Sequence, residues 1–195
     1  NFFLLFFLIY VLSAILLINK ISPNIELVKE YQRNYYVIGL RKIWHSRSEC
    51  IDFSDNQIYV PKKTSCKFDN IEFKTTISFD EFGRYSDHPN NNYNTGIAVL
   101  GDSHAMGWGV NDNETFSYLL EKKINRPVYN LAVSGYGTVR ELIRLRESNL
   151  LEKIDSIIIQ YCYNDHGENV HYKKTTLDAA KKKYKLVKEA TKLSF

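Results

Sequence analysis

Residues 97–109 of this chain read IAVLGDSHAMGWG, and this stretch decides the fold class. Its first four residues are apolar, and Gly-Asp-Ser-His follows directly at 101–104. A short apolar run that ends in glycine is typical of a buried strand that turns into a helix. We therefore expect a strand over 95–103, with a serine at the turn that follows it.

The sequence beyond this stretch repeats the alternation of strand and helix. PVYNLAVSG at 127–135 and SIIIQYCYND at 156–165 predict two more strands. ETFSYLLEKKI at 114–124 and TVRELIRLRESNLL at 138–151 have the spacing of helices. Strands that are almost wholly apolar and alternate with helices indicate an α/β fold, with a parallel sheet covered on both faces.

Polar groups follow each of the three predicted strands, at the edge where such sheets bind ligands. Ser103 ends the first strand, Gly135 the second and Asn164 the third. A hydroxyl, an open backbone N–H and a side-chain amide are what an acyl-transfer site needs. The serine oxygen attacks a carbonyl, and N–H donors hold the oxyanion that develops. We expect the three groups to converge at the carboxyl edge of the sheet.

These three blocks, Gly-Asp-Ser at 101–103, NLAVSGYG with Gly135 and YCYND with Asn164, resemble those of the SGNH hydrolases, also called GDSL-type esterases and lipases. The resemblance covers about residues 95–166. It implies a flavodoxin-like three-layer α/β/α sandwich and makes Ser103 the nucleophile. It also implies that the oxyanion hole consists of the N–H groups of Ser103 and Gly135 and the side chain of Asn164.

The family's fourth block, Asp-x-x-His, which supplies the catalytic base, has no match in this chain. We expect the base to lie on residues beyond the chain, so that the C-terminal part of the domain is missing. If the chain is complete, His166 is the candidate base, and a non-catalytic relative is the third possibility. His104 is a poor base for Ser103 because neighbours on a helix do not face each other. Ala105 stands where the Gly-x-Ser-x-Gly elbow of the α/β-hydrolases has its second glycine.

Several of these residues also have a purely structural interpretation. Ser103 could have no role other than to cap the helix that follows it, and Asp102 could hold the turn through a backbone hydrogen bond. Thr138 and Glu141 lie three residues apart and predict a capping box at the start of their helix. The Asn-Asp pair at 164–165 could be an ordinary turn.

The first segment, NFFLLFFLIYVLSAILLINK at 1–20, has no charge before Lys20. A hydrocarbon core needs about 17 to 25 such residues, so a transmembrane anchor is the first interpretation. A signal peptide is the second, because its apolar region is usually about 7 to 15 residues long. A buried core helix is the third. The anchor predicts a single-pass membrane protein with an extracytoplasmic domain, although the orientation of the segment stays open.

The three cysteines fall in two different settings. Cys50 and Cys66 lie sixteen residues apart in a polar region, whereas Cys162 lies in an apolar run. Downstream of an anchor, outside the cytoplasm, Cys50 and Cys66 would form a disulfide and Cys162 would stay a buried thiol. Three free thiols in a reducing compartment are the alternative. Neither spacing suggests zinc, so no metal or other cofactor is predicted.

Composition divides the chain into parts of different character. We expect an anchor at 1–20, a juxtamembrane connector at 21–48, a β-rich extension at 49–94 and the SGNH-like domain at 95–195. The formal net charge is +4, but residues 172–195 carry eight lysines and two acidic residues. Because the basic charge is confined to this tail, nucleic acid is not predicted as a partner.

Two functions follow from these expectations. The first is a membrane-anchored ester hydrolase or acyl transferase that acts on an acyl ester, for example one on an envelope glycan or lipid. The second is a non-catalytic binding or assembly domain that keeps the pocket and lacks the base. The membrane and an acyl-ester substrate are the predicted partners, and the oligomeric state stays open.

Overall fold

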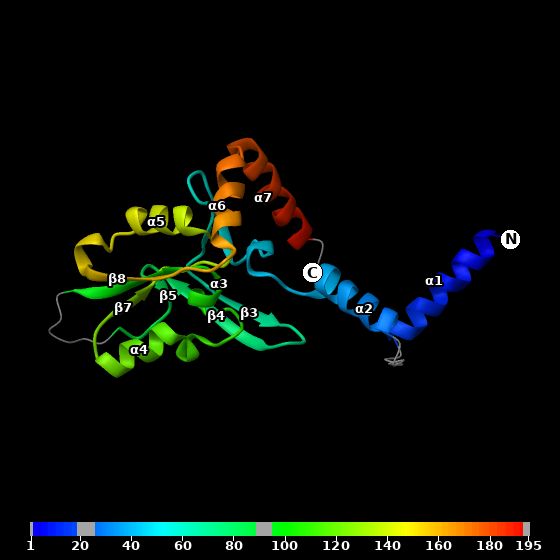
Figure 1. The fold of residues 1–195 in the computed structure, drawn as a ribbon, viewed down its shortest axis with the longest axis horizontal. Coiled ribbons are helices and arrows are strands. Elements are labelled where there is room, and N and C mark those ends of the chain that lie inside the picture. Colours follow the sequence, from blue (N-terminus) through cyan, green and yellow to red (C-terminus); the bar gives the residue numbers. More distant parts are fainter. Residues whose placement is uncertain (1, 19–25, 89–94, 193–195) are drawn as a thin grey trace. The chain divides into compact units, whose positions relative to one another are not determined.

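The computed structural model describes residues 2–18, 26–88 and 95–192 of the chain (Figure 1). It divides into two compact units, Asn1–Arg41 and Lys42–Phe195. The first unit contains two α-helices, α1 (Phe2–Ile18) and α2 (Glu26–Tyr35), and a π-helical turn at Tyr36–Leu40. The second unit contains the sheet and the remaining helices.

Among the described residues, no helix combines the length and the apolar character needed to cross a membrane. α1 has 17 residues, so its axis measures about 26 Å, against about 30 Å for a hydrocarbon core. The other residues of the predicted anchor, 1, 19 and 20, lie outside the described part.

The second unit is built on one six-stranded mixed sheet with the order β3-β4-β5-β7-β6-β8. The parallel part consists of β7 (Val128–Asn130), β6 (Gly96–Gly101) and β8 (Ile154–Gln160). The antiparallel part consists of β3 (Ser65–Asp69), β4 (Lys74–Asp80) and β5 (Gly83–Arg84). β5 joins the two parts by pairing antiparallel with β7. The fold is therefore α/β, with a sheet to which segments on both sides of residue 95 contribute.

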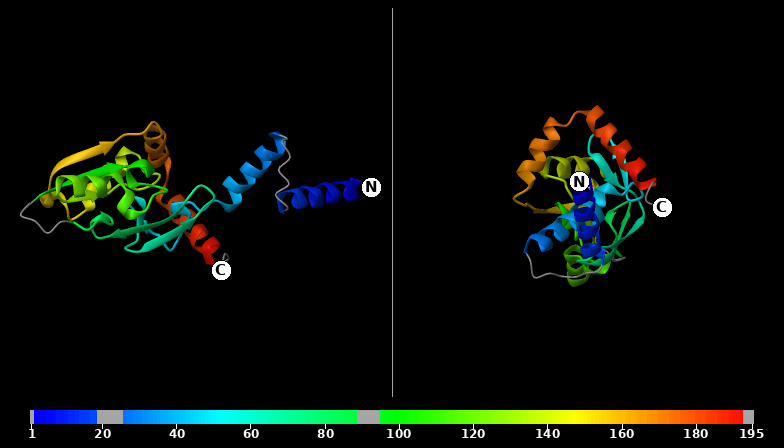
Figure 2. Two further views of the ribbon diagram at one scale, coloured as in Figure 1. Left: turned by 90° about the horizontal axis from the view of Figure 1, so that it is seen from below. Right: turned by 90° about the vertical axis from the view of Figure 1, so that its right-hand side faces the viewer.

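A separate hairpin and five α-helices belong to the described part of the second unit. The hairpin consists of β1 (Ile51–Ser54) and β2 (Ile58–Pro61). The helices are α3 (Ser103–Met106), α4 (Phe116–Ile124), α5 (Thr138–Glu147), α6 (Asp165–Lys174) and α7 (Leu177–Lys192). Figure 1 shows α4 and α5 on opposite faces of the sheet, and Figure 2 shows α6 and α7 joined at an angle.

The packing on both faces of β6 explains why its sequence is continuously apolar. Ile97 and Val99 belong to one hydrophobic cluster, together with Leu120 and Ile124 of α4. Ala98 and Leu100 belong to a second cluster on the other face, which includes Leu145 of α5. Because successive side chains of a strand point to opposite faces, a strand covered on both sides needs apolar residues at every position.

The expectation that all three parallel strands are covered on both faces is wrong for β8. β8 is the edge strand, and Ile157 and Ile159 are 48% and 50% exposed. The predicted strand at 127–135 is also shorter than expected, since β7 covers only three residues. The chain nevertheless stays beside β6, because Leu131 N–H and Val133 N–H donate to the carbonyls of Val99 and Gly101.

The helix at 116–124 forms as predicted, but it buries polar side chains. Phe116 and Leu119 are exposed, whereas Ser117 and Glu121 are buried. Glu121 accepts hydrogen bonds from Ser86 and from the backbone N–H of Val128, and it pairs with His88. These partners satisfy a carboxylate that burial alone would penalise.

The core beside β3 and β4 contains a disulfide between Cys50 and Cys66, whose Cα atoms lie 6.0 Å apart. Both cysteines are buried, and Cys162 is a free, half-buried thiol. Trp44, from the region expected to be a connector, is fully buried. Its ring centroid lies 5.1 Å from that of Phe79, so residue 44 is part of the folded core.

Candidate functional site

The three parallel strands end at one edge of the sheet. Gly101, the last residue of β6, pairs with Gln160, the last residue of β8. The carbonyl of Gly101 also accepts a hydrogen bond of 3.1 Å from the N–H of Val133, just beyond β7. The three candidate residues follow Gly101, Val133 and Gln160 by two, two and four positions. The sheet register therefore leads all three candidates to the carboxyl edge.

Three polar groups at this edge have no partner within residues 2–18, 26–88 and 95–192. They are the hydroxyl of Ser103, the backbone N–H of Gly135 and the side chain of Asn164. All three residues are half-buried. Half-buried polar groups that the protein itself does not satisfy remain open to a ligand or to water.

Asp102, and not Ser103, caps the helix α3. The Asp102 carboxylate accepts a hydrogen bond of 2.9 Å from the backbone N–H of His104. The interpretation of Ser103 as the cap is therefore wrong, and the expectation that Asp102 holds the turn is confirmed. Since the carboxylate takes the capping role, the neighbouring hydroxyl is left free.

Hydrogen bonds from neighbouring strands fix the turn that carries Ser103. The Gln160 side chain accepts from Ala105 N–H at 3.1 Å, and the Asn130 side chain donates to the Ala105 carbonyl at 2.9 Å. The buried guanidinium of Arg84 donates to the carbonyls of residues 106, 107 and 110. It also pairs with Asp112 at 2.9 Å. The backbone of α3 and of the loop after it is thus held by side chains from β5, β7 and β8.

A cavity of about 270 Å³ opens beside Ser103. Trp108, Thr115 and Phe116 contribute to its lining. Trp108 also packs edge-on against Phe68, with ring centroids 4.8 Å apart. The tryptophan therefore joins the wall of this cavity to the hydrophobic core.

Gly135 adopts a backbone conformation that suits glycine, with φ of +79°. A Cβ atom at this position would lie 2.6 Å from the hydroxyl oxygen of Tyr59. That hydroxyl donates to the carbonyl of Ser134 at 2.7 Å, and Arg140 donates to the carbonyl of Gly135. The carbonyls of this turn are thus bonded, whereas the Gly135 N–H is open.

No histidine hydrogen-bonds to Ser103 Oγ within the described ranges. His166 lies exposed in the first turn of α6, and His104 is exposed on α3. His88 pairs with Glu121 at 2.8 Å. His45 and His171 line a different cavity.

Three buried carboxylates lie next to the candidate residues, close enough to shift the pKa of one another. Glu141 and Asp165 are 1% and 0% exposed, and Asp102 is 1% exposed. Burial, followed by the charges of Asp165 and Asp102, raises the pKa of Glu141 to about 7. Burial, together with Asp102, also raises the pKa of Asp165. Charged carboxylates that share a dry environment disfavour ionisation of each other.

The predicted capping box at Thr138 and Glu141 is wrong. α5 has Gly137 at its cap position, without a side-chain cap, so Thr138 is already the first helical residue. Thr138 donates instead to Asp165 at 3.4 Å. Neither carboxylate oxygen of Glu141 has a hydrogen-bond partner among the described residues.

One group of side chains near α3 has the donor set of a metal site. Possible ligand atoms of Asp102, His104 and Cys162 all lie within 4.8 Å of one another. Carboxylate, imidazole and thiolate are the ligands that zinc takes. Spacing along the chain did not indicate this group, because Cys162 reaches α3 only through the pairing of β8 with β6.

Sequence reasoning missed Tyr59 and Arg140, and it gave Glu141 only a capping role. Tyr59 lies on β2, in the region expected to be a separate extension, and it reaches Ser134 across 75 positions of sequence. Arg140 and Glu141 are buried on α5. Glu141 lies four residues before the buried Leu145, so its place on the apolar face was the one signal available in the sequence.

Comparison with known proteins adds nothing to this geometry. The chain matches no protein-family model, no curated protein and no solved structure. The functional interpretation therefore rests on the motif resemblance and on the arrangement of the residues at the carboxyl edge.

Proposed function

We propose that this chain carries the nucleophile and the oxyanion hole of a serine ester hydrolase or acyl transferase of the SGNH type, on a flavodoxin-like three-layer framework. One observation carries the proposal: three polar groups of the required kinds lie open at the carboxyl edge of the sheet. They come from three neighbouring strand ends, and the hydroxyl is not used as a helix cap.

In the proposed reaction, Ser103 Oγ attacks the carbonyl carbon of an acyl ester. The ester C–O bond breaks, the alcohol leaves with a proton, and the acyl group remains on Ser103. Water releases it in a hydrolase, and a second alcohol accepts it in a transferase. The N–H groups of Ser103 and Gly135 and the amide of Asn164 hold the negative charge on the carbonyl oxygen.

We also propose that the protein is attached to a membrane through residues 1–20 and acts on an acyl ester of an envelope glycan or lipid. The apolar side chains of residues 2–10 support attachment, because each is more than half exposed. An apolar surface of this size usually marks a site of contact with another protein or a membrane.

A non-catalytic binding domain is the second candidate function. The observation that favours it is the lack of a histidine partner for Ser103 Oγ within the described residues. A serine without a general base is a weak nucleophile. His166 stays the candidate base within this chain.

Hydrolysis of p-nitrophenyl acetate by the full-length protein separates the two functions. We expect Ser103→Ala to lower the rate to that of the uncatalysed reaction. Ser134→Ala is the matched control, because Ser134 lies on the same edge and its hydroxyl forms no hydrogen bond with the described residues. Equal rates for the wild type and Ser103→Ala would rule out the serine mechanism and leave the binding domain.

A further inference from the structure

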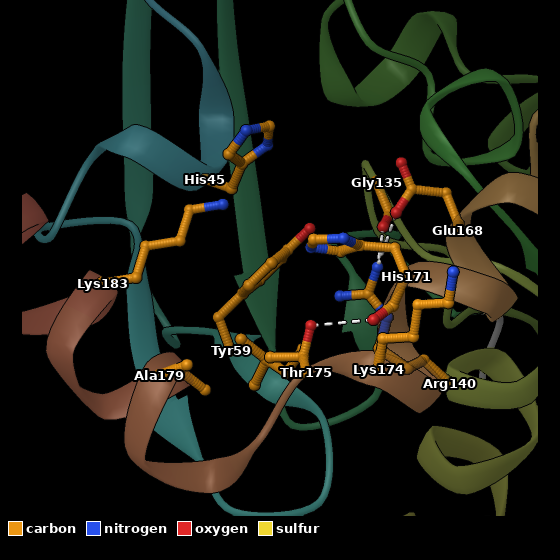
Figure 3. Close-up of a pocket in the computed structure, with 12 residues that line it drawn as sticks. His45, Tyr59, Gly135, Arg140, Glu168, His171, Lys174, Thr175, Ala179 and Lys183 are labelled. Carbon is orange, nitrogen blue, oxygen red and sulfur yellow. Dashed lines mark hydrogen bonds and ion pairs between the residues drawn. The ribbon is translucent and has the colours of Figure 1, made fainter.

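A second cavity, of about 400 Å³, lies beside Gly135 and has Tyr59 and Arg140 in its lining. It is formed by β2, the start of α5, α6 and α7, and Figure 3 shows its labelled side chains. Tyr59 and His45 form one wall, with ring centroids 5.8 Å apart in a stacked arrangement. Gly135 lines this cavity too, so the cavity adjoins the proposed oxyanion hole.

The charge in this cavity is predominantly positive. Arg140, Lys174 and Lys183 line it, and Glu168 is the only acidic residue that the described part of the chain contributes to the lining. Glu168 is already paired with Arg140, at 3.3 Å. The two lysines are exposed and unpaired by any described carboxylate, so the lining has an excess of cations.

His45, in the wall of this cavity, has a lowered pKa. Burial, followed by the charges of Lys183 and Arg140, lowers the pKa of His45 to about 4. Figure 3 shows Lys183 extended toward His45 from α7. The imidazole is therefore neutral at pH 7, and it adds hydrogen-bonding capacity without further charge.

Arg140 is held in place before any ligand binds. Its side chain is 4% exposed, and the guanidinium lies 4.5 Å from the ring centroid of Tyr136 and 5.4 Å from that of Tyr59. It donates to the carbonyl of Gly135. Its Nε is buried and has no partner among the described residues. A stacked, immobile guanidinium is well suited to recognise an oxyanion.

We propose that this cavity binds an anionic group of the substrate, a carboxylate or a phosphate on a sugar, and thereby places the acyl ester beside Gly135 and Ser103. The catalytic consequence of this proposal rests on the proposed function, whereas binding of the anionic group does not require catalysis. The aromatic wall of Tyr59 and His45 would contact the sugar ring, and the cations would contact its charged group.

Calorimetric titration of the full chain with glucuronate, glucose 6-phosphate and glucose tests the proposal. We expect the anionic sugars to bind and the neutral sugar to bind at least about tenfold more weakly. The two anionic sugars distinguish a carboxylate site from a phosphate site. If glucose binds as well as both anions, or if neither anion binds at millimolar concentration, the proposal is wrong.

A pair of double variants shows where the anion binds. Lys174→Ala with Lys183→Ala should weaken binding about tenfold or more. Lys182→Ala with Lys185→Ala removes the same charge from exposed positions of α7 outside the cavity lining, and it should leave affinity unchanged. Equal weakening by both pairs would overturn the proposal, because the attraction would then come from the basic helix as a whole.

Ser103→Ala separates the failure of this proposal from the failure of the proposed function. The variant should bind the anionic sugar with wild-type affinity. Anion binding in a protein that cleaves no ester would overturn the enzyme function and keep the cavity as a binding site. Cleavage of p-nitrophenyl acetate in a protein that binds no anion would overturn the cavity proposal alone.

Discussion

Replacing Glu141 by glutamine should stabilise the protein at high pH and have little effect at low pH. Glu141 is 1% exposed, and both carboxylate oxygens lack hydrogen-bond partners among the described residues. Burial, Asp165 and Asp102 raise its pKa from 4.5 to about 7. Glutamine has nearly the same shape and no charge, so the substitution removes the penalty of ionisation and leaves the packing in place.

The sign and size of the effect follow from proton linkage. Below pH 4.5 the carboxyl group is protonated in both the folded and the unfolded state, so its ionisation does not affect stability. Between pH 4.5 and 7 the folded state binds more protons than the unfolded state, so the free energy of unfolding falls as pH rises. Above pH 7 the carboxyl group is ionised in both states, so this group lowers the free energy of unfolding no further. A shift from 4.5 to about 7 corresponds to about 3 kcal/mol.

Urea denaturation of wild type and Glu141→Gln at pH 4 and pH 8.5 measures this difference. We expect the two proteins to have nearly equal stability at pH 4. At pH 8.5 the variant should be more stable by up to about 3 kcal/mol. A difference between the two proteins that is the same at both pH values would show that Glu141 does not titrate with a raised pKa in the folded state.

Three further predictions concern the oxyanion hole, the anchor and the disulfide. In an active full-length enzyme, Asn164→Ala should slow turnover by about 10² to 10³, the usual loss for one oxyanion donor; an unchanged rate would remove Asn164 from the site. Deleting residues 1–20 should move the protein from the membrane to the soluble fraction, and a truncated protein that resists salt washing from membranes would disprove the anchor. Intact-mass analysis of the native protein should show the Cys50–Cys66 bridge and one alkylatable thiol, Cys162, whereas three alkylatable thiols would exclude the bridge.

The strand ends were predictable from the sequence because they depend on local pattern. Ile97 to Leu100 are apolar at every position, which is the pattern of a strand buried on both faces, and β6 forms there. The polar residues after such strands reach one edge wherever the strands run parallel. This rule alone was enough to predict that Ser103 and Asn164 lie at the same edge.

The exposed face of β8 shows where local pattern is insufficient. The run Ile157 to Ile159 is as apolar as β6, yet two of its side chains are about half exposed at the sheet edge. Apolar composition indicates which residues favour burial, but packing of other segments over each face of the strand decides whether they are buried. Strand order depends on contacts between distant segments, which a single sequence does not reveal.

The second cavity was not predictable for the same reason. Its lining brings Tyr59 together with Gly135 and Arg140, which belong to segments far apart in the sequence. Lys183 reaches the same space from α7, in the lysine-rich C-terminal segment. The buried Glu141 was hidden by a plausible local role, since its distance from Thr138 matches a capping box, whereas the helix begins one residue too early for that motif.

Covalent labelling tests the central claim most directly. The full-length protein is treated with a fluorophosphonate, which modifies activated serines, and the modified peptide is sequenced by mass spectrometry. The proposed mechanism predicts an adduct on Ser103 in the wild type and in Ser134→Ala, and no labelling of Ser103→Ala. Labelling that persists in Ser103→Ala, or an adduct on another residue, would contradict the assignment of Ser103 as the nucleophile.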